Sequence, residues 1–117
     1  MIRGEIWTVA CGGDYAGKPR PVVILQDDRF VDTGSITVCG VTTNPALAPL
    51  FRIAVEPTHE NGLKSVSRLM VDKIVTVPKV KLGHRIGCLK EGDIVRLNRA
   101  IVVFLGLAGA PSSKSPS

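Results

Sequence analysis

The chain has 117 residues, of which 44% are hydrophobic and 21% are charged, and these values are typical of one soluble globular domain. Fifteen Lys and Arg residues against ten Asp and Glu residues give a formal net charge of +5 at pH 7, which favours an anionic partner. The composition excludes a collagen, a coiled coil and a disulfide-rich secreted miniprotein.

The cysteines and the ends of the chain bear on metal binding and location. Cys11, Cys39 and Cys88 form neither a CxxC pair nor a zinc-finger spacing, and His59 and His84 add no ligand pattern. We therefore expect buried apolar cysteines and no metal site. The first five residues carry a charge pair where a signal peptide needs an apolar core, and the longest uncharged apolar run covers only residues 100–110. A reduced, cytoplasmic protein with no membrane partner is expected.

Short β-strands are predicted over most of the chain. Apolar and polar residues alternate over residues 4–10, which is the two-residue period of a half-buried strand. The continuous apolar run from Val22 to Leu25 predicts a strand that is buried on both faces. Further strands are expected at residues 35–42, 51–55, 66–71 and 73–77, with Pro78 ending the last of them. Loops separate these runs, and the pair Asn61-Gly62 is a strong signal for a tight turn.

The last element has the pattern of an amphipathic helix. From Glu91 to Leu107, apolar residues recur three and four positions apart, at Ile94, Leu97, Ile101, Phe104, Leu105 and Ala108. The β-branched Val102 and Val103 leave a terminal strand as the alternative. Several short strands followed by one helix predict a mainly β (α+β) domain over residues 1–109, built as a small barrel or a strongly curved sheet. Residues 110–117 form a polar tail that we expect to be disordered.

The glycine-rich segment 12–21 is the first candidate for a functional site. Arg20 lies between Pro19 and Pro21, which stiffen the backbone around a guanidinium whose planar fork of donors suits phosphate oxygens. The alternative is a solvated surface arginine beside a strand. Asp14 is the carboxylate of this loop, and it can take a proton from a nucleophile or orient Arg20 through a charge-assisted hydrogen bond. Tyr15, in the same loop, can stack on a base.

A second candidate follows the predicted strand at residues 35–42. Thr42 and Thr43 end this strand and precede Asn44, and a threonine hydroxyl can donate to a phosphate oxygen. Threonine is also a favoured strand residue, so a purely structural role is the alternative. Strict alternation would place the two threonines on opposite faces of the strand, and a bulge at Gly40 would disturb that alternation. The pattern does not choose between them.

In their order along the chain, these segments resemble the MazF/PemK family, the toxins of bacterial toxin–antitoxin pairs within the CcdB/PemK superfamily. Arg3-Gly4-Glu5-Ile6-Trp7 is similar to the family's opening strand, and residues 12–25 are similar to its glycine-rich loop and Arg-Pro strand. The match continues through Val41-Thr42-Thr43, residues 69–77 and residues 86–89 to the terminal helix. The resemblance spans residues 2–107.

The resemblance implies an SH3-like antiparallel barrel with a C-terminal helix, usually a homodimer. It also implies sequence-selective cleavage of single-stranded RNA by the RNA's own 2′-hydroxyl, without a metal or other cofactor. Arg20 would be the catalytic arginine, Thr42 the catalytic threonine, and Asp14 would stand where many members have glutamate. The candidate RNA-binding residues are Tyr15, Lys18, Thr43 and Asn44.

The resemblance further implies a cognate antitoxin, whose acidic C-terminal segment would compete with RNA for the same groove. The toxin would contact DNA only indirectly, through this antitoxin. Two alternatives remain open. One is a CcdB-like toxin, which binds DNA gyrase and cleaves nothing, and the other is a non-catalytic barrel that binds nucleic acid or a peptide. CcdB-like chains end in Trp-Gly-Ile, whereas the single tryptophan of this chain is Trp7.

Overall fold

The computed structural model describes residues 1–10, 18–45 and 51–109 of the chain. The strands in these ranges are β1 (Glu5–Val9), β2 (Arg20–Ile24), β3 (Ser35–Thr42), β4 (Arg52–Val55), β5 (Ser67–Pro78) and β6 (Leu82–Cys88). Two short 3-10 helices, η2 (Asp28–Phe30) and η3 (Lys79–Lys81), precede β3 and β6, and the α-helix α1 covers Glu91–Phe104. The predicted glycine-rich loop at residues 11–17 and the predicted tail at residues 110–117 lie outside the described residues.

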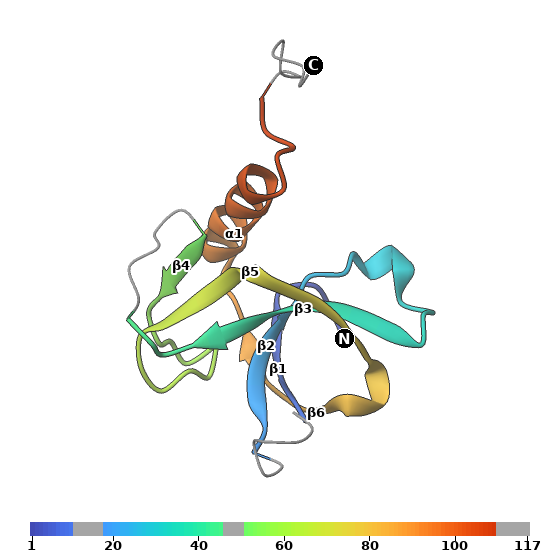
Figure 1. Ribbon diagram of the computed structural model, residues 1–117. Helices are drawn as coiled ribbons and strands as arrows, with labels where there is room; N and C mark the ends of the chain where they lie inside the picture. The colour runs from blue at the N-terminus through green and yellow to red at the C-terminus, as the bar shows by residue number, and fades with distance from the viewer. Residues whose placement is uncertain (11–17, 46–50, 110–117) are drawn as a thin grey trace.

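The strands form one antiparallel sheet in the order β4-β5-β3-β2-β1-β6 (Figure 1). Within the described ranges, β4 and β6 lie at its two ends, so the sheet is curved but not closed. The helix α1 follows β6 and packs against β4 and β5. The mainly β architecture with a C-terminal helix, expected from the sequence, is confirmed in the form of an open curved sheet.

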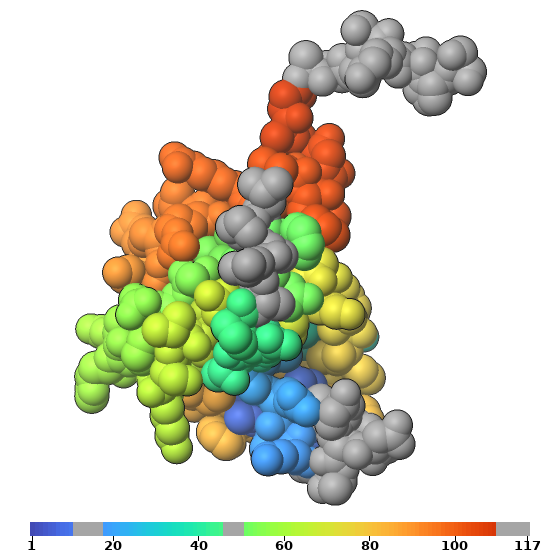
Figure 2. All heavy atoms as spheres, turned by 60° about the vertical axis from the view of Figure 1, so that its left-hand side comes forward, coloured from blue at the N-terminus to red at the C-terminus, as the bar shows by residue number. Residues whose placement is uncertain are grey.

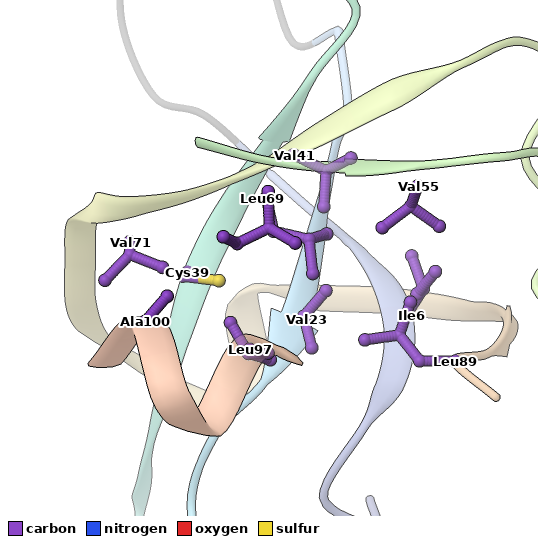
Figure 3. Packing of buried hydrophobic residues seen from close by; sticks show 11 residues of the cluster. Ile6, Val23, Cys39, Val41, Val55, Leu69, Val71, Leu89, Leu97 and Ala100 are labelled. Atoms are coloured by element: carbon purple, nitrogen blue, oxygen red, sulfur yellow. The ribbon is translucent and has the colours of Figure 1, made fainter. Parts of the chain in front are cut away.

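Two apolar clusters lie on the two faces of this sheet. The main cluster lies between the sheet and α1 (Figure 3), and its buried members are Ile6, Val23, Cys39, Val41, Ile53, Val55, Leu69, Val71, Leu89, Leu97 and Ala100. The second cluster consists of Val9, Val22, Ile24, Ile36 and Val38. Successive residues of a strand point to opposite faces, so β2 contributes Val23 to the first cluster and its two neighbours to the second. The prediction that this strand is buried on both faces is confirmed.

The helix α1 buries one face and ends earlier than predicted. Leu97 and Ala100 are buried in the main cluster, and the Phe104 ring lies tilted against Phe51 with the ring centroids 5.7 Å apart. Gly106 then adopts a φ of 74°, which most residues avoid. The Leu107 N–H donates to the Val102 carbonyl at 2.8 Å, the bond of a Schellman helix end. The helix therefore ends at Phe104 rather than at Leu107.

The two strands predicted at residues 66–71 and 73–77 are one strand, β5, with an irregularity between them. In the pairing of β3 with β5, Cys39 pairs with Ile74 but the next residue, Gly40, pairs with Met70. Residues 71–73 are therefore extra residues of β5 without counterparts in β3, which defines a β-bulge. The irregularity predicted at Gly40 is confirmed, although its extra residues belong to the partner strand.

The strand β6 was not predicted from the sequence pattern. Its sequence, Leu-Gly-His-Arg-Ile-Gly-Cys, contains two glycines and two polar side chains, and most of its residues are exposed or half-buried. Because β6 pairs with β1 and lies at the edge of the sheet, it buries too little apolar surface to show a two-residue period.

In the described part of the chain, no helix is long and apolar enough to cross a lipid bilayer.

Candidate active site

An open cleft of about 430 Å³ lies on the face of the sheet that carries the second cluster. It crosses the end of β1, the start of β2, the end of β3 and the middle of β5. Its polar lining residues are Arg20, Thr42 and Lys73. The remaining lining residues are Val9, Ala10, Pro21, Val22, Gly40, Val41, Met70, Val75 and Val77.

Arg20 reaches this cleft because it is the first residue of β2. It pairs with Val9 of β1, so hydrogen bonding within the sheet fixes its backbone, while its side chain is exposed. Pro21 follows and pairs with Thr8. A guanidinium held at the edge of an open cleft can contact an anion without losing all of its hydration. That Pro19 and Pro21 hold the guanidinium in one place stays a prediction.

Thr42 is the last residue of β3 and lines the same cleft. Its Oγ1 accepts a hydrogen bond from the Asn44 N–H at 3.1 Å, a local turn that fixes the position of the oxygen. The hydroxyl can still donate its own proton to a phosphate oxygen. In Figure 2, the light-blue atoms of the β2 region lie next to the blue-green atoms of the region where β3 ends. The fold therefore brings the two predicted catalytic residues, Arg20 and Thr42, to one cleft.

Thr43 directly follows the end of β3 and does not line the cleft of Thr42. Thr43 lines a neighbouring cleft of about 540 Å³ instead. Pro21 lines both clefts. The other residues of this second cleft are Thr8, Pro19, Gly62, Leu63, Lys64, Ser65, Ser67, His84, Arg85 and Ile86. Lys64 and Arg85 make the second cleft basic as well.

The remaining predicted site residues have different positions. Lys18 and Asn44 are exposed and line neither of the two clefts, although the Asn44 backbone supports Thr42. Asp14 and Tyr15 lie outside the described residues. Sequence reasoning missed Lys73, which lines the first cleft. The signal that points to it is the interruption of the strand pattern at residue 72, which marks the bulge.

A buried carboxylate holds Arg85 at the rim of the second cleft. Glu5 Oε2 accepts from Arg85 Nε at 2.7 Å, and its Oε1 accepts from the Ile2 N–H at 2.8 Å and the Trp7 indole N–H at 3.0 Å. Burial alone would raise the pKa of Glu5, but these three hydrogen bonds together lower the pKa below its usual value. Glu5 is therefore ionised at neutral pH, and its role is to hold Arg85 and the N-terminal backbone in place.

The cysteines and potential metal ligands do not form a site in the described part of the chain. Burial raises the pKa of the Cys39 thiol to about 12, so this thiol is protonated and inert at neutral pH. Cys39 is a buried apolar cysteine as predicted, Cys88 is half-buried, and Cys11 lies outside the described residues. Among residues 1–10, 18–45 and 51–109, no group of three His, Cys, Asp or Glu side chains is arranged to hold a metal ion.

Comparison with known proteins identifies the family. Residues 2–105 match the family of PemK-like, MazF-like toxins of type II toxin–antitoxin systems. The chain belongs to this family. Its sequence is 57% identical over 109 residues to a protein of Mycolicibacterium smegmatis named "Probable endoribonuclease MazF", and the match covers 93% of this chain and 100% of that protein. The resemblance to MazF/PemK toxins expected from the sequence is confirmed.

Solved structures support the fold of this MazF-like chain. The Mycobacterium tuberculosis toxin MazF-mt6 superposes with a TM-score of 0.74 at 26% sequence identity, over 87% of this chain and 96% of that one. A mycobacterial endoribonuclease in complex with its cognate antitoxin superposes with a TM-score of 0.78 at 22% identity, over 94% of this chain and 99% of that one. The second likeness concerns the fold alone.

Proposed function

We propose that this MazF-like chain is the toxin of a type II toxin–antitoxin pair, that it cleaves single-stranded RNA, and that the cleft of Arg20 and Thr42 is its active site. The observation that carries the proposal is the convergence of a guanidinium and a hydroxyl, from the start of β2 and the end of β3, on one open cleft. Membership of the toxin family and the name of the 57% identical relative support the same activity.

The proposed chemistry uses a nucleophile that RNA itself supplies. The 2′-oxygen attacks the adjacent phosphorus, the new bond closes a 2′,3′-cyclic phosphate, and the bond to the 5′-oxygen of the next nucleotide breaks. Negative charge grows on the phosphate oxygens during the attack, and the Arg20 guanidinium and the Thr42 hydroxyl can donate hydrogen bonds to them. The proton of the 2′-hydroxyl goes to a base and the 5′-oxygen gains a proton. Asp14 is the candidate base, with orientation of Arg20 as its alternative role.

The proposed partners follow from the same surfaces. The first cleft contains Arg20 and Lys73 and the second contains Lys64 and Arg85, so both favour a polyanion. RNA would lie across them, with Tyr15, Lys18, Thr43 and Asn44 as candidate contacts. An antitoxin with an acidic C-terminal segment would compete for these clefts, and this chain would reach DNA only through that antitoxin. We propose that it acts as a homodimer in the cytoplasm, where its RNA substrates are found.

The proposal is tested by incubating the purified protein with total RNA in excess EDTA and sequencing the new 5′ ends. We expect cleavage at a short recurring sequence, and no cleavage when the nucleotide before the cut carries 2′-deoxyribose. Cleavage only with an added divalent metal, or cleavage of an all-DNA analogue, would refute the mechanism. Binding of RNA without any cleavage would favour a non-catalytic barrel, and inhibition of DNA gyrase supercoiling without RNA cleavage would favour a CcdB-like toxin.

A further inference from the structure

The bulge in β5 places Lys73 on the cleft face of the sheet, whereas strict alternation along the strand would place it on the opposite face. Leu69 and Val71 both point into the main cluster, so strict alternation would send the side chain of residue 73 into the same cluster. Instead Ile74 packs against the main cluster, and Lys73 lines the cleft together with Met70. The alternation therefore changes phase inside the bulge. Bulges that redirect a side chain in this way are frequent beside active sites.

An ion pair outside the cleft holds the bulge in place. Asp72, within the bulge, accepts from Arg52 of β4 through two parallel hydrogen bonds, from Nε to Oδ1 at 2.6 Å and from Nη2 to Oδ2 at 2.8 Å. The side chains of Arg52 and Asp72 are only 16% and 21% exposed. Two-point pairing between a guanidinium and a carboxylate is among the stronger and more directional polar contacts in proteins. It fixes the backbone on one side of Lys73.

The cleft then presents two cations from different strands. Arg20 belongs to β2 and Lys73 to β5, with the strand β3 and its residue Gly40 between them. The lining residues of this cleft within the described ranges include no carboxylate. An ammonium group is a compact point charge that suits one phosphate, whereas the guanidinium fork suits the charge that develops on a reacting phosphate. Two separated cations on one groove match two phosphates of one RNA strand.

We propose that Lys73 binds a phosphate neighbouring the scissile one and thereby positions the RNA strand for reaction at Arg20. This inference rests on the proposed function, because it needs an RNA substrate in this cleft. Lys73 would contact a phosphate that carries the same charge before and during the reaction. Its contribution would therefore appear in substrate binding rather than in the chemical step.

The first test compares the cleavage kinetics of Lys73→Gln with those of a control variant that loses one positive charge away from the cleft. With an oligonucleotide that contains the mapped cut site, Lys73→Gln should raise KM about tenfold and leave kcat within about threefold, while Lys73→Arg should recover most of the affinity. The slope of log affinity against log salt should fall in magnitude by about 0.7, the value for one phosphate contact on a single strand. The matched control is Lys90→Gln. Lys90 precedes α1 and lies near the start of β1, whereas the cleft lies at the other end of this strand, at Val9. The Lys90 side chain makes no capping hydrogen bond to α1, so its replacement should not disturb the helix.

The second test identifies the phosphate. In a series of oligonucleotides made uncleavable by 2′-deoxyribose at the cut site, one phosphate at a time is replaced by an uncharged methylphosphonate. The affinity of each oligonucleotide is measured for the wild-type protein and for Lys73→Gln. The wild-type protein should lose affinity at the scissile phosphate and at one or more neighbours, and Lys73→Gln should be insensitive at one of those neighbours only. Equal sensitivity of the two proteins at every position would overturn the inference, as would kinetics of Lys73→Gln that match those of Lys90→Gln. If the wild-type protein cleaves no RNA, the proposed function itself fails.

Discussion

Arg20 and Thr42 are related through the register of β2 and β3. Val22 of β2 pairs with Gly40 of β3. Because the strands are antiparallel, two residues back from Val22 is Arg20 and two residues on from Gly40 is Thr42. Because a step of two residues keeps the face of the sheet, both residues lie on the side of the cleft. The register of the two strands therefore brings the backbones of these two residues to the same end of the β2–β3 pair. Replacing either side chain should leave the sheet intact.

We expect Arg20→Ala to slow RNA cleavage by at least about 10²–10³-fold, because a well-placed donor contributes roughly 3–4 kcal/mol to stabilising the developing charge. Arg20→Lys should rescue poorly, since an ammonium keeps the charge but loses the fork. Single-turnover cleavage measures both effects, and thermal unfolding checks that the variants remain folded. Cleavage by folded Arg20→Ala within about threefold of wild type would show that Arg20 is only a surface charge.

The control for Arg20 is Arg99→Ala on the exposed face of α1. Arg96, another basic residue of the predicted helix, is less suitable. The Nη1 of Arg96 donates to the Ala54 carbonyl at 2.9 Å and to Asp93 Oδ1 at 3.0 Å, so this side chain joins α1 to β4. Arg99→Ala should lower the affinity for RNA slightly and leave the single-turnover rate unchanged.

Thr42 can be tested with substitutions that separate its hydroxyl from its shape. Thr42→Val keeps the branched shape but removes both the acceptor for the Asn44 N–H and the donor to phosphate, so we expect a loss of about 10²-fold or more in the single-turnover rate. Thr42→Ser keeps the oxygen and should retain activity within about tenfold. If the valine and serine variants cleave equally well, the hydroxyl has no part in the reaction.

Glu5 should contribute to the dependence of stability on pH. Its pKa in the folded protein lies below the usual value of 4.5, so the unfolded chain binds the proton more readily. The stabilisation by ionised Glu5 is therefore fully present above about pH 4.5 and is lost as the pH falls through the lower folded-state pKa. Urea unfolding between pH 7 and pH 3 should show that Glu5→Gln is less stable at pH 7 and declines less steeply in acid. Parallel curves for the two proteins would contradict this role.

Gly87 should be intolerant of a side chain for a steric reason. A Cβ at this position would overlap the backbone of Glu60 and Asn61, and the adjacent Cys88 N–H is already bonded to the Glu60 carbonyl at 2.9 Å. We expect Gly87→Ala to lower the free energy of unfolding by about 1–3 kcal/mol, as measured by urea unfolding. Gly92 in α1 is the matched control, because a Cβ there would meet nothing within 4 Å. Gly92→Ala should stabilise the protein by about 0.5–1 kcal/mol, and a similar result for Gly87→Ala would exclude the overlap.

Cys39 should resist alkylation in the folded protein. It is fully buried, and burial raises its pKa to about 12, so the reactive thiolate is nearly absent at pH 8. Iodoacetamide followed by peptide mass spectrometry should leave Cys39 unmodified under native conditions and modify it in denaturant. Rapid native labelling at this residue would mean that the main cluster opens readily.

The sequence by itself determined the features that depend on local spacing. The continuous apolar run at residues 22–25 indicated a strand buried on both faces, and the helical spacing after Glu91 indicated α1. The residues Arg20 and Thr42 could be selected because proline context, residue type and family resemblance are all readable along one chain. The roles of Asp14 and Tyr15 remain predictions of that kind.

The tertiary structure decided what depends on the pairing of distant strands. The face of Thr42 follows from the register of β2 with β3, and the direction of Lys73 follows from a bulge in the pairing of β5 with β3. The strand β6 shows no two-residue period because it lies at the edge of the sheet and buries little apolar surface. Periodicity records which side of a strand is buried, but register and bulges arise from hydrogen bonds between segments far apart in the chain. For that reason the sequence indicated the candidate catalytic residues, and only the fold brought them together with Lys73 in one cleft.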